Sequence, residues 1–180
     1  MTLTKITVNN AVKPMAKMTA LDATFATAAH TATGQKRKYT HEPYIVHPEE
    51  VVNILRGRSF TTPEMLAAAW LHDVVEDTHV SPLDIDEMFG REVAILVMYL
   101  TDSRAEVGNR EYRKSVDMRR LGDAPAEAQN IKLADIISNT SSITKHDPDF
   151  AKVYLKEKAA MIEVLTNGDP ALIELARANI

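Results

Sequence analysis

The chain has 180 residues, of which 45% are hydrophobic and 26% charged, with a net charge of −4 and no cysteine. This composition excludes a disulfide scaffold, a thiolate metal site and a thiol nucleophile, and it argues against a broadly basic surface for nucleic acid. No apolar run approaches the ~20 residues that span a bilayer, and no signal peptide is recognisable. We therefore expect a cytoplasmic protein without a nucleic-acid or membrane partner, whose reactive groups are His, Asp, Glu, Lys and Arg.

Hydrophobic periodicity predicts helices over nearly the whole chain. Two starts are clearly marked, because Pro63 and Pro82 stand in a first turn after the N-cap residues Thr62 and Ser81. The short helix that begins at Ser81 is expected to end at Gly90. In chain order, helices are expected over residues 20–33, from Pro48, from Pro63, and over residues 81–90, 91–100, 109–121, 125–144, 149–165 and 170–178, with Gly168 before the last.

The predicted fold class is all-α. Only Leu3–Val8 alternates like a strand, and it is too short and isolated to build a sheet. We predict one domain over residues 19–180, preceded by an N-terminal extension over residues 1–18. The sequence alone leaves the oligomeric state open.

The most informative segment carries one imidazole and three carboxylates within six residues of an apolar helix, at His72, Asp73, Glu76 and Asp77. His72 and Glu76 are four residues apart, as are Asp73 and Asp77, so the four groups are expected to form a polar stripe near one helix face. Burying these acids unpaired would be very costly, and no Lys or Arg lies within that helix. A divalent metal ion is the simplest way to neutralise them.

Two distant residues are candidates to complete such a site. His47 stands just before a helix start, and Asp135 lies in the middle of another apolar helix. Together with His72 and Asp73 they would form a mixed nitrogen and oxygen site with positions left for water and substrate. A set without sulfur suits an octahedral ion such as Mn²⁺, and other divalent ions would also fit.

Several blocks of the sequence resemble a known family. The pair His72-Asp73, with distant His47 and Asp135, is similar to the HD phosphohydrolase superfamily. Six blocks in the same order narrow the resemblance to the hydrolase domain of RelA/SpoT-type alarmone enzymes, and in particular to a stand-alone small alarmone hydrolase like the metazoan SpoT homologue. The blocks are Gly34–Lys38, Glu42–Pro48, Leu71–Thr78, Phe89–Gly90, Leu100–Asp102 and Lys132–Asp135. The resemblance implies an HD-domain helical bundle with a divalent metal site between helices.

The resemblance also implies roles for individual residues. The metal ligands for Mn²⁺ would be His47, His72, Asp73 and Asp135. Glu76 and Asp77 would act beside the metal, positioning or activating the attacking water. The implied reaction removes the 3′-diphosphate of the guanosine alarmones (p)ppGpp as pyrophosphate, leaving GDP or GTP.

The nucleotide would be bordered by Arg37 and Lys38, and Asn139 would contact its ribose region. The family's helix carries two basic residues that this chain replaces by Ile136 and Ser141. Tyr154 and Lys158, four residues apart on the following helix, could face the nucleotide, and the basic segment 109–115 could supply compensating charge. A solvated helix face is the competing interpretation for both groups.

Two other functions stay open at this point. The loss of the basic positions allows a different substrate, such as the 2′-phosphate of NADPH or another nucleotide phosphate. A catalytically silent nucleotide-binding module is the third reading, and the complete set of six site residues argues against it. The remaining histidines, His30, His41, His79 and His146, fit no ligand position and are predicted to be surface or helix-face residues.

Overall fold

The structure is a computed structural model that describes residues 15–103 and 105–180, with side chains from residue 20 onward. Within these residues it is built from helices, and the one β-contact is an isolated bridge between Lys36 and Pro43. The helices are α1 (Met15–Ala32), α2 (Val46–Leu55), α3 (Pro63–Leu71), α4 (Val74–Asp77), α5 (Pro82–Phe89), α6 (Arg91–Leu100), the 3₁₀ turn η1 (Ala105–Val107), α7 (Arg110–Gly122), α8 (Ala126–His146), α9 (Pro148–Ile162) and α10 (Pro170–Ala178). The predicted all-α class is confirmed.

The helix boundaries follow from local capping. The Thr62 side chain accepts a hydrogen bond from the backbone amide of Met65 at the start of α3. Ser81 and Asp84 form a reciprocal capping box at the start of α5. Gly90 separates α5 from α6 with a φ of 95°, a backbone conformation that L side chains rarely adopt. These predicted boundaries are therefore confirmed.

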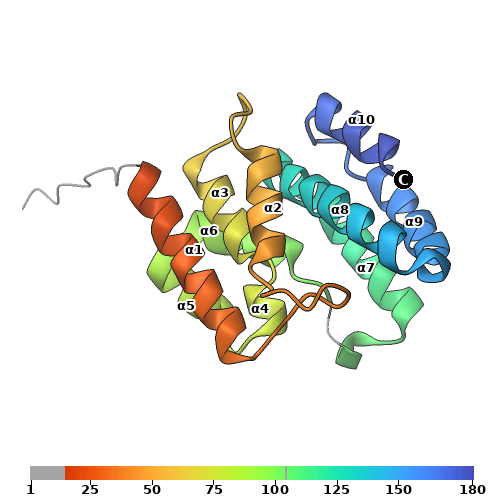
Figure 1. The fold of residues 1–180 in the computed structure, drawn as a ribbon. Coiled ribbons are helices and arrows are strands. Elements are labelled where there is room, and N and C mark those ends of the chain that lie inside the picture. Colours follow the sequence, from red (N-terminus) through yellow and green to blue (C-terminus); the bar gives the residue numbers. More distant parts are fainter. Residues whose placement is uncertain (1–14, 104) are drawn as a thin grey trace, which may run out of the picture.

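Two helices form the centre of the molecule (Figure 1). Helix α3 packs against α1, α2, α6 and α8, and all of its residues from Met65 to Leu71 are buried. Helix α8 packs against α2, α3, α6, α9 and α10. An apolar helix that is buried on every side gains most of its stability from packing. Helix α8 differs from α3 because it also buries polar residues, among them Lys132, Asp135 and Ser138.

Most of the predicted N-terminal extension, residues 1–18, lies outside the described residues. The alternating segment Leu3–Val8 lies entirely outside them. Helix α1 begins at Met15, within the last part of that predicted extension. Among the described helices, none combines the length and apolar character needed to cross a membrane.

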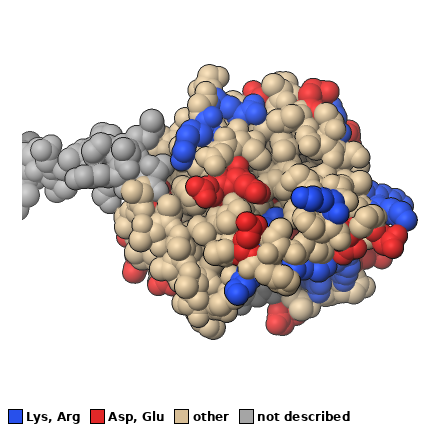
Figure 2. All heavy atoms as spheres, viewed as in Figure 1, with Lys and Arg blue, Asp and Glu red and all other residues tan. Residues whose placement is uncertain are grey.

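The face shown in Figure 2 carries both signs of charge. Lys and Arg side chains occupy several separate areas, and acidic side chains gather near the middle of the view. Charge on this face is therefore mixed, in keeping with the net charge of −4.

Candidate metal centre

The helix expected to carry the polar stripe is interrupted, and the prediction of one continuous helix was wrong. Helix α3 ends at Leu71, and α4 is a separate turn of four residues, Val74–Asp77. The cause is a side chain, because His72 Nδ1 lies 2.8 Å from the carbonyl oxygen of Ala69. In a continuous α-helix the amide of Asp73 would bond to that oxygen. The imidazole takes its place, and the chain turns between His72 and Asp73.

This turn brings three predicted ligands together. His47, at the start of α2, and His72 and Asp73, after α3, each offer a ligand atom within 4.8 Å of the others. Asp73 Oδ2 lies 3.1 Å from His72 Nε2 and 3.7 Å from His47 Nε2. Both imidazoles are almost fully buried. A group of this kind can hold a metal ion.

The donor atoms suit a cation. Because the Nδ1–H of His72 points at the Ala69 carbonyl, Nε2 faces Asp73, and it is buried without a hydrogen-bond partner. Burial alone would lower the pKa of His72, but the charges of Asp73 and Asp135 outweigh burial and raise it to about 9. The position thus favours positive charge, and a divalent ion can supply that charge as well as a proton can. The residues present fit a metal site.

Asp135, the fourth predicted ligand, lies beside this group. Its Oδ1 is 3.2 Å from His47 Nε2, although Asp135 does not belong to the group of three whose ligand atoms all lie within 4.8 Å of one another. Lys132 Nζ contacts Asp135 Oδ2 at 2.8 Å, and the Asn139 amide donates to Oδ1 at 2.6 Å. Lys132 and Asp135 are both buried, so this acid has a basic partner on its own helix.

The two inner carboxylates, Asp73 and Asp135, are held in the charged form. Burial would raise their pKa values, but His72 and His47 keep the pKa of Asp73 below its ordinary range. Lys132, helped by His47, does the same for Asp135. The Tyr44 hydroxyl adds a 2.6 Å hydrogen bond to Asp73 Oδ2. Carboxylates that stay ionised when buried are suitable metal ligands.

The two outer carboxylates, Glu76 and Asp77, have the opposite electrostatic surroundings. Partial burial and the nearby Asp102 raise the pKa of Glu76 to about 7, although Glu76 Oε2 accepts a 3.0 Å bond from the Asp102 amide. Burial and Asp73 raise the pKa of Asp77, whose Oδ2 accepts from the Gln35 amide at 2.8 Å. An acid that titrates near neutral pH can exchange a proton with water.

Arg37 and Asn139 meet next to the inner carboxylates. The Arg37 guanidinium donates to Asn139 Oδ1 at 3.2 Å, and Asn139 in turn donates to Asp135. Lys38 lies elsewhere, because its ammonium contacts Tyr39 at 3.1 Å and Asp147 at 3.6 Å, and its side chain is 71% exposed. Of the predicted basic pair, the structure therefore joins only Arg37 to the metal-centre residues.

Tyr154 and Lys158 lie on α9, with the Lys158 ammonium 5.3 Å from the Tyr154 ring centroid. Tyr154 is buried, so a solvated helix face is the wrong description for it. Burial and the neighbouring Lys132 lower the pKa of Lys158 to about 8. Burial has the largest effect on the pKa of Tyr154 and raises it, and the charge of Asp135 raises it further. Both residues therefore share the electrostatic surroundings of α8 near Asp135.

The basic segment 109–115 reaches the outer carboxylates at one point. A hollow is lined by Glu76, Asp77, Asp102, Ser103, Ala105, Glu106 and Arg113. Lys114 contacts Asp102 at 3.5 Å. The expectation that this segment could supply compensating charge is consistent with these positions.

Sequence reasoning missed three supporting residues, His30, Gln35 and Tyr44. His30 was predicted to be a surface or helix-face residue, but it is only 1% exposed and its Nδ1 lies 2.6 Å from Gln35 Oε1. Gln35 then donates to Asp77, so His30 orients the amide that holds this acid. Gln35 and Tyr44 both lie inside sequence blocks that resemble the family, and this position was the only sign in the sequence that they could support the site.

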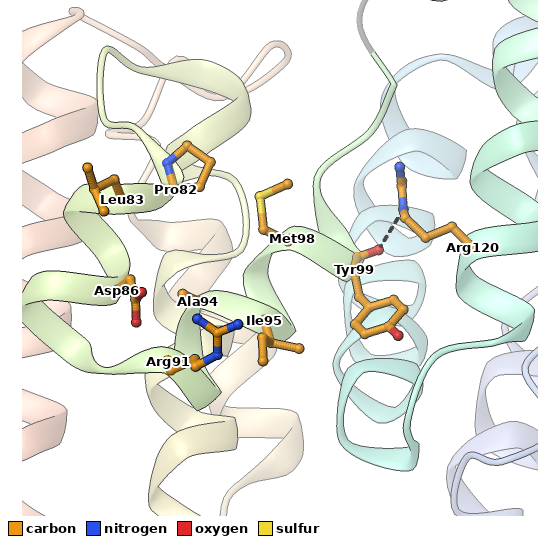
Figure 3. Close-up of a pocket in the computed structure, with 9 residues that line it drawn as sticks. All are labelled: Pro82, Leu83, Asp86, Arg91, Ala94, Ile95, Met98, Tyr99 and Arg120. Atoms are coloured by element: carbon orange, nitrogen blue, oxygen red, sulfur yellow. Dashed lines mark hydrogen bonds between the residues drawn. The ribbon is translucent and has the colours of Figure 1, made fainter.

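A second hollow lies away from these residues, over α5 and α6 (Figure 3). Its lining is mainly apolar, with Leu83, Ile95 and Met98 partly exposed. Arg120 closes one side by donating to the backbone oxygen of Tyr99 at 3.2 Å. No member of the metal-centre group lines this hollow.

Comparison with known proteins gives a consistent result. A family model described as "HD domain" matches residues 23–161. A guanosine-3′,5′-bis(diphosphate) 3′-pyrophosphohydrolase named MESH1, from Drosophila melanogaster, is 36% identical over 123 residues, which cover 67% of this chain and 68% of that protein. A probable enzyme of the same name from Synechocystis is 32% identical over 143 residues, and the chain spans about a fifth of its length (19%).

A solved structure is similar over almost the whole chain. It is described as a metazoan ortholog of SpoT that hydrolyses ppGpp and plays a role in starvation responses. The two structures superpose with a TM-score of 0.80 and 25% sequence identity, covering 98% of this chain and 96% of that one.

Proposed function

Because this chain belongs to the HD-domain family, we propose that it is a metal-dependent hydrolase that removes the 3′-diphosphate of (p)ppGpp. The products are pyrophosphate and GDP or GTP. The observation that carries the proposal is the group of buried His47 and His72 with half-buried Asp73, and with Asp135 3.2 Å from His47. Relatives named for this reaction cover two thirds of the chain, which supports the substrate class.

The metal is proposed to be Mn²⁺, held by His47, His72, Asp73 and Asp135. When bound, such an ion lowers the pKa of water and offsets charge on phosphoryl oxygens. A set of imidazole nitrogens and carboxylate oxygens supports this choice. We also propose a cytoplasmic location, since a cysteine-free chain suits a reducing compartment.

The chain's own residues divide the remaining work. Glu76 takes the proton from the attacking water, because its pKa of about 7 matches a general base at neutral pH. Asp77, fixed by Gln35, positions that water. Attack falls on the phosphorus that bears the 3′ oxygen, and the bond from this phosphorus to the 3′ oxygen breaks. The nucleoside keeps that oxygen as its 3′-hydroxyl, which takes up the proton that Glu76 removed from the water.

Basic and polar groups on two sides of the centre hold the nucleotide. Arg37 and Asn139 are hydrogen-bonded to each other beside Asp135, with Lys38 further out on the same loop. Tyr154 and Lys158 are proposed to contact the nucleotide from α9, where the charges of Lys132 and Asp135 act on Lys158. Positive charge on both sides would offset the negative charge of a substrate with two diphosphates.

A nucleotide panel tests the substrate. Purified protein with Mn²⁺ is incubated in parallel with ppGpp, pppGpp, NADPH and GTP, and the products are identified by chromatography. The proposal predicts GDP and pyrophosphate from ppGpp at a rate at least tenfold above that for NADPH. A folded protein that binds Mn²⁺ and leaves ppGpp intact would contradict it.

The second candidate is another nucleotide phosphate, such as the 2′-phosphate of NADPH. One observation favours it: Ile136 is fully buried and the Ser141 hydroxyl donates to the Ser138 carbonyl, so neither position offers a substrate a positive charge. Under this alternative the same panel gives orthophosphate from NADPH as the main product.

A further inference from the structure

His47 has a second polar contact on the side of its ring away from Asp73 and Asp135. Its Nδ1 lies 2.9 Å from the Ser138 hydroxyl oxygen, and that hydroxyl lies 2.6 Å from Glu50 Oε2. His47 and Ser138 are almost fully buried, whereas Glu50 is exposed on the next turn of α2. The three side chains thus link a buried predicted ligand to the surface across α2 and α8.

The direction of these hydrogen bonds can be worked out from the number of protons available. The Glu50 carboxylate can only accept, so the single Ser138 hydroxyl proton must go to Glu50. The hydroxyl oxygen then has only lone pairs to offer His47, and Nδ1 must carry a proton to donate to it. In a neutral imidazole this leaves Nε2 unprotonated.

Unprotonated Nε2 is the atom that faces the metal centre. It lies 3.2 Å from Asp135 Oδ1 and 3.7 Å from Asp73 Oδ2. In His72 the Ala69 carbonyl likewise accepts from Nδ1, which leaves Nε2 as the atom that faces Asp73. A partner on the far ring nitrogen commonly fixes the tautomer and orientation of a metal-binding histidine.

We propose that Glu50 and Ser138 are positioning residues that hold His47 in the Nδ1–H tautomer, with Nε2 aimed at the metal. This inference rests on the metal site of the proposed function but not on its substrate. Neither residue touches the nucleotide or the reacting atoms. Their loss lowers metal affinity first, and the rate falls only because less metal is bound.

The first test reads the tautomer directly, without metal or substrate. Protein labelled with ¹⁵N-histidine is examined by long-range ¹H–¹⁵N correlation at mildly alkaline pH, and the His47 signals are assigned by their absence in His47→Gln. The wild type is expected to show Nδ1 protonated. A wild-type His47 that carries a proton on Nε2 and none on Nδ1 would overturn the proposal, whether or not the protein hydrolyses ppGpp.

The second test measures Mn²⁺ affinity from the free-ion electron paramagnetic resonance signal. Ser138→Ala is expected to weaken binding by roughly 10- to 100-fold, and Ser138→Thr, which keeps the hydroxyl, should restore most of it. Glu50→Ala should weaken binding less, and Glu49→Ala is the matched control on the same helix, with affinity unchanged. Wild-type affinity in both Ser138→Ala and Glu50→Ala would also overturn the proposal.

A protein that fails to bind Mn²⁺ even as wild type would instead contradict the proposed function. The tautomer measurement still decides the role of Ser138 in that case. If Ser138→Ala does not fold, Glu50→Ala and the wild-type spectrum carry the test, because Glu50 is exposed and its removal leaves no buried cavity.

Discussion

The inner carboxylates (Asp73 and Asp135) and the outer carboxylates (Glu76 and Asp77) lie close together but have opposite electrostatic surroundings. In the inner pair Asp135 is buried and Asp73 half-buried, and the imidazoles and Lys132 hold both pKa values low. The outer pair has only partial burial and acidic neighbours, which raise both pKa values. Groups whose pKa values are pushed apart take different chemical roles. The inner pair is built to bind a cation, and the outer pair to carry a proton.

Removing an inner ligand should have the largest effect. His72→Ala and Asp73→Ala are each expected to lose Mn²⁺ binding and at least about 1,000-fold in kcat, because a metal contributes several kcal/mol to the transition state. Calorimetric titration with Mn²⁺ and turnover of ppGpp are measured on the same samples. Either variant binding Mn²⁺ normally would remove that residue from the metal centre.

Changing an outer carboxylate should separate metal binding from rate. Glu76→Gln is expected to keep its Mn²⁺ affinity while kcat falls by about 10²–10⁴-fold, the usual contribution of a general base. The wild-type kcat/KM should rise as the pH rises through about 7, since Glu76 must lose its proton before it can accept one.

That rise with pH should be absent in Glu76→Gln. Glu106→Gln is the matched control, because Glu106 is exposed and lines the same hollow. An unchanged rate and pH profile in Glu76→Gln would show that the outer pair does not act as the base.

A third test compares two Lys–Asp ion pairs whose partners are three residues apart on a helix. Lys132–Asp135 is buried at 2.8 Å, and Lys152–Asp149 is exposed at 2.9 Å. Lys132→Met removes the ammonium beside the buried Asp135, leaving only His47 and Asn139 against it, and should lower the free energy of unfolding by about 3–5 kcal/mol. Lys152→Met should change it by about 0–1 kcal/mol.

Urea unfolding of both variants without metal measures the difference. Mn²⁺ should recover more stability in Lys132→Met than in the wild type, since the ion replaces the missing positive charge. Equal losses in the two variants would show that Asp135 does not depend on Lys132.

The smallest expected effects concern the substrate. Arg37→Ala should raise KM by about 10-fold or more, because a hydrogen bond to a charged group contributes about 1.5–3 kcal/mol. Lys38→Ala should change KM by less than about fivefold, since its exposed contact with Asp147 lies away from the inner carboxylates. Steady-state kinetics with ppGpp distinguishes the two, and a larger effect for Lys38→Ala would reverse their assignment.

Most of the fold could be predicted because its signals are local. Thr62 with Pro63 and Ser81 with Pro82 mark helix starts within a few residues, and both starts are where the sequence placed them. The break after Leu71 could not be predicted in the same way. It depends on a side chain, since the His72 imidazole takes the carbonyl that would have continued the helix.

The site was predictable in part for the same reason. His72 and Asp73 are adjacent in sequence, and the positions of His47 and Asp135 made them candidates that the family resemblance then supported. The hydrogen-bond partners of the site residues come from far along the chain: Ser138 is 91 residues from His47, and Gln35 is 42 residues from Asp77. Lys132 was visible in a quoted block, but only its packing beside Asp135 shows what it does.

The most direct test of the central claim is to follow the water oxygen. Wild-type protein with Mn²⁺ hydrolyses ppGpp in H₂¹⁸O, and the products are identified by mass spectrometry. Attack at the phosphorus bearing the 3′ oxygen predicts GDP without label and pyrophosphate carrying one ¹⁸O. Labelled orthophosphate, or label in the GDP 3′-hydroxyl, would contradict the account.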